Sequence, residues 1–253
     1  MSDQAVQPAA ETAPGLTQWQ RVSNIFSAPS KTFEDIRRGN RSWWMPFLIM
    51  VLVGYIFFAA VTTKIGWNQV AQNAIHMNPK AEERMQQAPP AQRDISMKFT
   101  EYFTEGISAA SPLVLLIAAA VMALVLWGTI NFLFAGKATF PSIFVVLMYA
   151  WLPGIIKTLL GTIVIYAGMA PEAFNIRNFA PTNLGAFLNP LETNPAVYAL
   201  ASAIDFTTIW MLVLVSIGVA IVAGAKRSSG YIAVFGWWAI LVLAGAGWAA
   251  IMG

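Results

Sequence analysis

The sequence predicts an all-α polytopic membrane protein with five transmembrane helices and further helices in its loops. Hydrophobic residues make up 57% of the 253 residues and charged residues only 11%, against about a quarter charged in ordinary soluble domains. The charges are also segregated, which leaves long uncharged stretches of the length that a membrane-crossing helix requires. A soluble globule of this size could not bury so much apolar surface, so we expect an integral membrane protein.

Several classes of function lack the residues that they need. Cysteine is absent and His76 is the only histidine, which excludes disulfides, thiolate nucleophiles and imidazole metal clusters. The phosphate-binding glycine loop, the nucleophile elbow and the zinc-protease motif are also missing, so we expect no enzyme activity, no cofactor and no metal. The net charge of +3 is spread over several loops, which indicates contact with a lipid bilayer and not with nucleic acid.

The N-terminal part of the chain divides into a tail and an amphipathic segment. Residues 1–17 are rich in Ala, Pro and small polar residues, and we expect a disordered tail. Residues 18–42 place apolar side chains on one helical face, with an interruption at Pro29 and an end at Gly39, which predicts an interfacial segment on anionic lipid. Packing of this segment on the transmembrane helices is an equally favoured interpretation. The residues expected at the membrane interface are Trp19, Phe26, Phe33, Arg37, Arg38, Trp43 and Trp44.

Residues 43–253 are predicted to form the transmembrane domain. Pro112 and Pro141 stand in the first turns of the second and third spans, where a missing N–H is not needed. The third and fourth spans exceed the ~20 residues that a ~30 Å hydrocarbon core needs, which predicts tilt, a kink at Pro153 or turns beyond the bilayer. The five spans are expected at 43–63, 112–134, 141–168, 196–225 and 230–252.

Two long connections are predicted to fold over the bundle. In the loop 64–111, Asn78 and Pro79 indicate a helix start, and an apolar stripe leads into the second span, which together predict a helical hairpin. The loop 169–195 mixes Asn and Pro turns with large apolar residues, so we expect it to cover the bundle mouth. The stripe consists of Ile95, Phe99, Tyr102, Phe103 and Ile107.

Basic residues in the short loops predict the orientation. Lys137, Lys226 and Arg227 lie in two loops on the same side as the basic N-terminal segment. The loop between the third and fourth spans contains only Arg177. This distribution favours a cytoplasmic N terminus and an outside C terminus. The first loop carries five basic residues on the other side, but loops this long are weaker indicators.

Lys157 stands near the middle of the third span, where an unpaired charge costs roughly 3 kcal/mol or more. It lies about 11 residues, or ~16 Å, before the end of that span, and Asp205 lies about 9 residues, or ~14 Å, after the start of the next. Because one loop joins those two ends, the residues lie at similar depth, which predicts an ion pair between antiparallel helices. The hydroxyl groups available as hydrogen-bond partners belong to Thr158, Thr162, Thr207 and Thr208.

A competing interpretation places the start of the fourth span at Phe206. Phe206 to Ala225 is long enough to cross the bilayer by itself, so Asp205 would lie at the interface. Lys157 would then extend its side chain toward the headgroups or face water.

Three stretches of the sequence carry a resemblance to a known family. They are IFSAPSKTFEDIRRGNRSWWMPFLI (25–49), GKATFPSIFVVLMYAWLPGII (136–156) and DFTTIWMLVLVSIGVA (205–220). Together they resemble the Ypt-interacting protein (Yip-type) membrane domain, over roughly residues 20–250, and the loop-decorated form is similar to bacterial members. The resemblance implies a five-helix membrane domain. Eukaryotic relatives act in vesicle traffic and bind prenylated small GTPases, so a GTPase partner is implied here by family analogy alone.

Two functions are consistent with these features. The sequence favours a non-catalytic membrane-organising or partner-binding scaffold in a bacterial inner membrane, in contact with lipid and with a protein partner or a second copy of itself. The alternative is a small ion or solute channel or transporter that uses Lys157 and Asp205, because intramembrane ionisable residues often mark such paths. Flux through proteoliposomes that depends on this pair would favour the alternative.

Overall fold

The computed structural model describes residues 15–252 and contains five helices long and apolar enough to cross a membrane. Every regular element within these residues is a helix, which confirms the all-α polytopic fold class. The tail expected over residues 1–17 falls almost entirely outside the described part of the chain. The five candidate spans are Trp44–Ile65, Ser111–Phe134, Phe140–Tyr166, Phe206–Ala223 and Arg227–Ile251.

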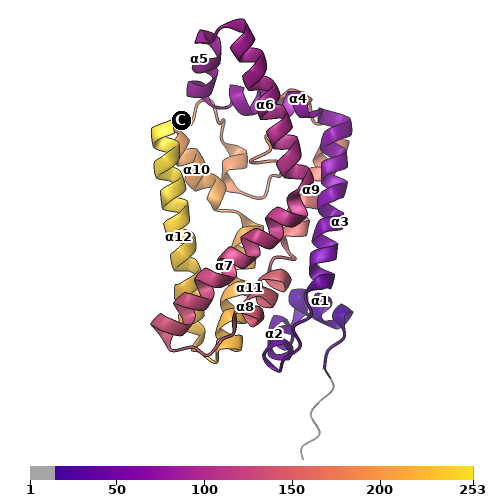
Figure 1. Ribbon diagram of the computed structural model, residues 1–253, viewed down its shortest axis with the longest axis vertical. Coiled ribbons are helices and arrows are strands. Elements are labelled where there is room, and N and C mark those ends of the chain that lie inside the picture. The colour runs from indigo at the N-terminus through magenta and orange to yellow at the C-terminus, as the bar shows by residue number, and fades with distance from the viewer. Residues whose placement is uncertain (1–14, 253) are drawn as a thin grey trace, which may run out of the picture.

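Three of the spans are peripheral and two are central. Half of the apolar window is buried in the third and fourth spans, against 17–22% in the other three. Among the peripheral helices, α7 crosses the molecule obliquely, whereas α3 and α12 follow its long axis (Figure 1). The peripheral helices are α3 (Trp44–Ala60, continued by the π-helical turn Val61–Ile65), α7 (Ser111–Phe134) and α12 (Arg227–Met252). The central helices are α8 (Phe140–Ala150) and α9 (Gly154–Tyr166), which together form the third span, and α11 (Phe206–Ala223).

Two short helices form an N-terminal layer, which we define as α1 (Gln18–Ser27) and α2 (Pro29–Arg37). The Thr17 side chain and the Gln20 side chain each bond the other residue's backbone, a capping box that starts α1. Pro29 occupies the first turn of α2, where a residue without an N–H fits without loss. Both helices therefore begin where the local sequence favours a helix N terminus.

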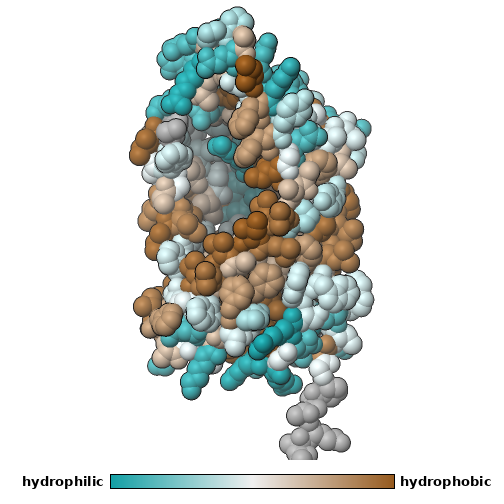
Figure 2. Space-filling view, viewed as in Figure 1, coloured by the Kyte–Doolittle hydropathy of each residue, from teal (hydrophilic) through white to brown (hydrophobic). Residues whose placement is uncertain are grey.

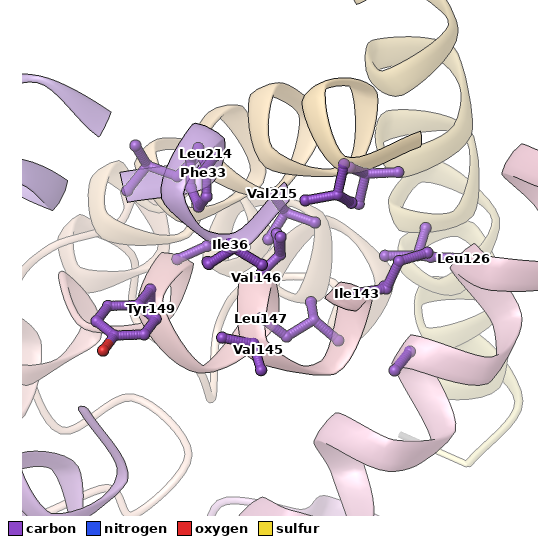
Figure 3. Packing of buried hydrophobic residues seen from close by; sticks show 14 of the residues in the cluster. Phe33, Ile36, Leu126, Ile143, Val145, Val146, Leu147, Tyr149, Leu214 and Val215 are labelled. Atoms are coloured by element: carbon purple, nitrogen blue, oxygen red, sulfur yellow. The ribbon is translucent and has the colours of Figure 1, made fainter. Parts of the chain in front are cut away.

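The N-terminal layer packs into the main hydrophobic core. Phe33 and Ile36 of α2 are buried against α8 and α11 (Figure 3). A Cβ atom at Gly218 of α11 would lie 2.5 Å from a Val146 methyl carbon and 2.9 Å from the Phe33 ring, so this close approach requires glycine. Phe33 was expected to contact the membrane, and this prediction is wrong because protein encloses the whole ring.

The third span is interrupted at its centre. Its first helix ends at Ala150, residues 151–153 form a turn, and α9 starts at Gly154. Pro153 has no N–H to donate to the preceding turn, which is a sufficient cause for the interruption. The kink at this proline therefore accommodates part of the excess length of the span.

The stretch 196–225, predicted as one span, contains two helices. They are α10 (Pro195–Ala203) and α11, separated by Ile204 and Asp205, and the candidate span is α11 alone. Asp205 has an extended backbone and its side chain accepts the Thr208 N–H, which makes it the N-cap of α11. The loop before α10 runs alongside this break, and the Phe206 N–H donates to the Thr182 carbonyl at 2.9 Å.

The first loop folds into α4 (Trp67–His76), α5 (Pro79–Gln87) and α6 (Pro90–Ala109). Trp67 and Val70 of α4 pack in a second core cluster with Phe174 of the loop 169–195. The hairpin of α5 and α6 extends beyond the bundle at the end opposite the N-terminal layer (Figure 1). All members of its apolar stripe are exposed: Ile95, Phe99, Tyr102, Phe103 and Ile107.

Hydropathy varies along the long axis of the molecule. Hydrophobic residues gather around the middle and hydrophilic residues at both ends (Figure 2). Large apolar side chains on the peripheral helices, such as Leu52, Val121 and Leu243, are more than half exposed. Because water would oppose such exposure, this middle zone is the surface that faces lipid.

Candidate functional site: an intramembrane charge pair

Lys157 and Asp205 lie in direct contact. Lys157 Nζ donates to Asp205 Oδ2 at 2.9 Å, and the same ammonium lies 5.6 Å from the centroid of the Phe179 ring. The Asp205 side chain is 2% exposed, whereas 22% of the Lys157 side chain is exposed. The anion is thus enclosed by protein, and the cation keeps a narrow contact with its surroundings.

Asp205 accepts from four donors on three segments of the chain. Besides Lys157, Thr182 Oγ1 donates to Oδ2 at 2.6 Å, and Thr207 Oγ1 and the Thr208 N–H donate to Oδ1 at 2.6 and 2.9 Å. Both carboxylate oxygens of Asp205 are therefore occupied by donors from within the protein.

The four threonines proposed as support divide into two pairs. Thr207 and Thr208 bond Asp205, as described above. The hydroxyl groups of Thr158 and Thr162 instead donate to backbone carbonyls four residues earlier in α9. These two hydroxyls therefore form their hydrogen bonds within α9 and donate none to the charge pair.

Sequence reasoning missed Thr182, which belongs to the loop 169–195. Its neighbour Asn183 forms an isolated antiparallel bridge with Asp205. A loop without periodicity gives no register against a distant helix, so no pattern in the sequence could place this hydroxyl. The site consequently joins α9, this loop and the start of α11.

The two interpretations of Lys157, an ion pair with Asp205 at similar depth or a fourth span that starts at Phe206, each describe part of the geometry. The fourth transmembrane helix does start at Phe206, as the competing interpretation holds. Asp205 nevertheless reaches Lys157, because α10 and the loop carry the start of α11 to the level of α9. The carboxylate therefore lies at a helix break inside the protein.

A second buried ion pair lies in the N-terminal layer and was not anticipated. Arg21 of α1 has no exposed surface, and its Nε lies 2.9 Å from Asp35 Oδ2 of α2. Its terminal nitrogens donate to the Ser42 carbonyl at 2.9 Å, the Asn40 carbonyl at 2.5 Å and the Tyr149 hydroxyl at 3.2 Å. Arg21 thus ties α1, α2 and α8 together.

The residues expected at the membrane interface take different positions. Trp19 and Phe26 are 70% and 40% exposed on the N-terminal layer, and Trp44 is 55% exposed at the start of α3. Trp43 packs edge-on against Phe144 of α8, with ring centroids 5.5 Å apart, so it also contributes to the core. The remaining two residues of the prediction, Arg37 and Arg38, are exposed on the same layer as Trp19.

Comparison with known proteins identifies one family. No curated protein and no solved structure matches the chain. The family model of the Yip1 domain matches residues 23–249, which is nearly all of the chain. This chain is therefore a membrane protein of the Yip1 domain family.

Proposed function

We propose that the protein is a non-catalytic scaffold of a bacterial inner membrane that organises lipid or binds a partner at its N-terminal layer. The observation that carries this proposal is the hydrogen bonding of Asp205. Four donors from within the protein occupy its two carboxylate oxygens. A carboxylate with this many internal partners joins segments and has little capacity left for a moving ion. These bonds join α9, the loop 169–195 and α11, and a fixed arrangement of helices suits a scaffold.

The charge distribution supports a cytoplasmic N-terminal layer. Within the described residues, the end formed by this layer and the two short loops beside it holds eight basic and two acidic residues. The opposite end, with its longer loops, holds six basic and seven acidic residues. Cytoplasmic loops carry the excess of Lys and Arg, so the basic end is assigned to the cytoplasm. Exposed Trp19 and Phe26 give it apolar contact points as well.

The transport alternative has one supporting observation, the 22% exposure of the Lys157 side chain. It is tested by ion flux in proteoliposomes that contain the wild type or the double variant Lys157→Met with Asp205→Asn. Asparagine keeps an acceptor for the Thr208 N–H and is a good N-cap, so the fold is retained. We expect the same flux from both proteins and from empty vesicles. Flux that only the wild type supports would establish transport and reject the scaffold.

Partner binding is tested by photo-crosslinking in cells. A photoreactive amino acid at the exposed Ser23 of α1 should give discrete adducts with protein, because this position faces away from the bundle. The matched position Leu241, 55% exposed in the middle of α12, should give adducts with lipid only. If Ser23 also yields only lipid adducts, the layer is a membrane contact and binds no protein partner.

A further inference from the structure

A cavity lies near the C-terminal end of the molecule, between α10 and α12. Its volume is about 500 Å³, within the range of small-molecule sites. The junction of α4 and α5 and the loop 169–195 complete its wall. Figure 2 shows that the face of the molecule in view is hollowed beside α12 in its upper half, with hydrophilic residues inside. The scaffold proposed above makes no use of this space.

One part of the cavity wall is apolar and comes mainly from α12. Val242, Gly245 and Ala246 leave room along this helix because their side chains are small or absent. Ile176 of the loop and Trp248 of α12 add larger apolar surfaces. Trp248 is 65% exposed, and tryptophan favours the level of the lipid headgroups. An apolar chain is the natural occupant of this part.

The rest of the wall offers hydrogen-bond donors and one positive charge. Asn178 Nδ2 donates to the Tyr198 hydroxyl at 3.1 Å, so this hydroxyl retains its own proton for another acceptor. Arg177 is exposed and forms no ion pair with any residue in the range 15–251. Among the residues that the structure describes, no Asp or Glu lines the cavity. This combination favours a ligand that carries an anionic group with several acceptor oxygens.

We propose that this cavity binds one molecule of an anionic amphiphile, with its apolar chain along α12 and its head group against Arg177 and Tyr198. Two sources share this chemistry, the phosphate of an anionic phospholipid and the carboxylate of a fatty acid. A neutral or zwitterionic head group lacks the net charge that Arg177 would compensate. The site thus selects a ligand by its head group and holds it by its chain.

The test is native mass spectrometry of the intact protein titrated with three probes: phosphatidylglycerol, phosphatidylcholine with the same chains, and oleic acid. The wild type should bind one molecule of an anionic probe about tenfold more tightly than phosphatidylcholine, since one charge-assisted hydrogen bond is at stake. A preference for phosphatidylglycerol over oleic acid identifies phosphate as the head group, and the reverse identifies carboxylate. Equal affinity for all three probes overturns the proposal.

Two pairs of variants locate the site. An added Cβ meets no atom within 4 Å at Gly245, which lines the cavity, or at Gly247, which does not. Gly245→Leu should therefore fill the cavity and abolish binding of the single molecule, and Gly247→Leu should bind as the wild type does. Arg177→Gln should lower the ratio of the affinity for anionic probes to that for phosphatidylcholine from about ten to about one. The exposed control Arg84→Gln should leave this ratio unchanged. Binding that survives Gly245→Leu places the lipid elsewhere and refutes the assignment.

Discussion

Asp205 serves as a helix cap, a counter-ion and an anchor for a loop with a single carboxylate. Its partner Lys157 has fewer functions: within residues 15–251, the ammonium donates to this carboxylate and lies over the ring of Phe179. Removal of the anion therefore leaves four donors without their acceptor, whereas removal of the cation takes away one of those four donors. An uncompensated charge left behind in either case is costly at membrane depth.

A double-mutant cycle measures the energy that couples the pair. Lys157→Met and Asp205→Asn should each lower the free energy of unfolding, because each leaves one charge without its partner. The two losses added together should exceed the loss in the double variant by about 1–2 kcal/mol. The measurement is equilibrium unfolding in mixed micelles. The exposed pair Arg37 and Glu34, 3.8 Å apart, is the control and should couple by less than about 0.5 kcal/mol. A coupling energy near zero for Lys157 and Asp205 would contradict the structural role.

Loss of the Arg21 side chain is predicted to lower the free energy of unfolding more than loss of the Lys157 side chain does. Arg21→Met leaves Asp35 buried without its cation and removes hydrogen bonds to two carbonyls and to Tyr149, so unfolding should become easier by about 3–5 kcal/mol. Arg38→Met, on the exposed surface of the same layer, should change stability by no more than about 0.5 kcal/mol. Equal thermal stability of the two variants would show that Arg21 does not hold the layer.

The predictability of these two ion pairs differs for a physical reason. A cation in a 27-residue apolar span stands out, and chain connectivity limits the depth of its partner. Arg21 lies among other polar residues of an amphipathic segment, where cations are common and normally solvated. Its burial depends on the contact between α1, α2 and α8, which is a property of the tertiary fold.

Helices that pack closely require small residues at their points of contact, and α11 and α12 are packed in this way. A Cβ atom at Gly230 of α12 would lie 2.2 Å from the Ser216 carbonyl oxygen and 3.0 Å from the Ala220 methyl group. A backbone oxygen cannot move aside as a flexible side chain can. The two helices must therefore separate if any side chain is placed there.

Gly230→Ala is accordingly predicted to destabilise the protein by about 1–3 kcal/mol through overpacking. Gly236→Ala in the same helix is the matched control, since its new methyl group meets no atom within 4 Å. The control should be neutral or stabilise by up to about 1 kcal/mol, because alanine is the better helix former. Thermal unfolding in detergent compares the two variants. A similar loss in both would mean that the contact between α11 and α12 is not limiting.

The number and order of the spans could be predicted from hydropathy, but their interruptions could be predicted only in part. Pro153 marks the break in the third span by its own chemistry. The break before α11 depends on Thr182 and on the Thr208 N–H, and the largely apolar, uncharged run from Ala196 to Ile204 gives no sign of it. Long-range hydrogen bonds of this kind have no periodic signature.

The two ends of the molecule differ in charge and in shape. The basic N-terminal layer is compact and fixed to the bundle, whereas the opposite end carries the projecting hairpin of α5 and α6 (Figure 1). One candidate span, Trp44–Ile65, separates the N-terminal layer from this hairpin along the chain, which places the two on opposite sides of a bilayer. Any partner of one end is therefore separated by the membrane from any partner of the other.

Cysteine labelling determines which end faces the cytoplasm. The chain has no cysteine, so Ser23→Cys in α1 and Gln86→Cys in α5 each introduce a single thiol at an exposed position. In intact cells, a membrane-impermeant maleimide should label Gln86→Cys and leave Ser23→Cys unlabelled until the membrane is opened. The reverse pattern would invert the assigned orientation and move the basic layer outside.

Lys157 precedes Asp205 by 48 residues, so the ribosome delivers the cation before its counter-ion exists. At synthesis rates of about 5–20 residues per second, the interval is roughly 2–10 s. An ammonium that enters the hydrocarbon during this time lacks its counter-ion, at a cost of about 3 kcal/mol. The nine residues of α10 are too short to cross the bilayer alone, so the next span is complete only when α11 has emerged. We therefore expect the two central spans to enter the lipid together.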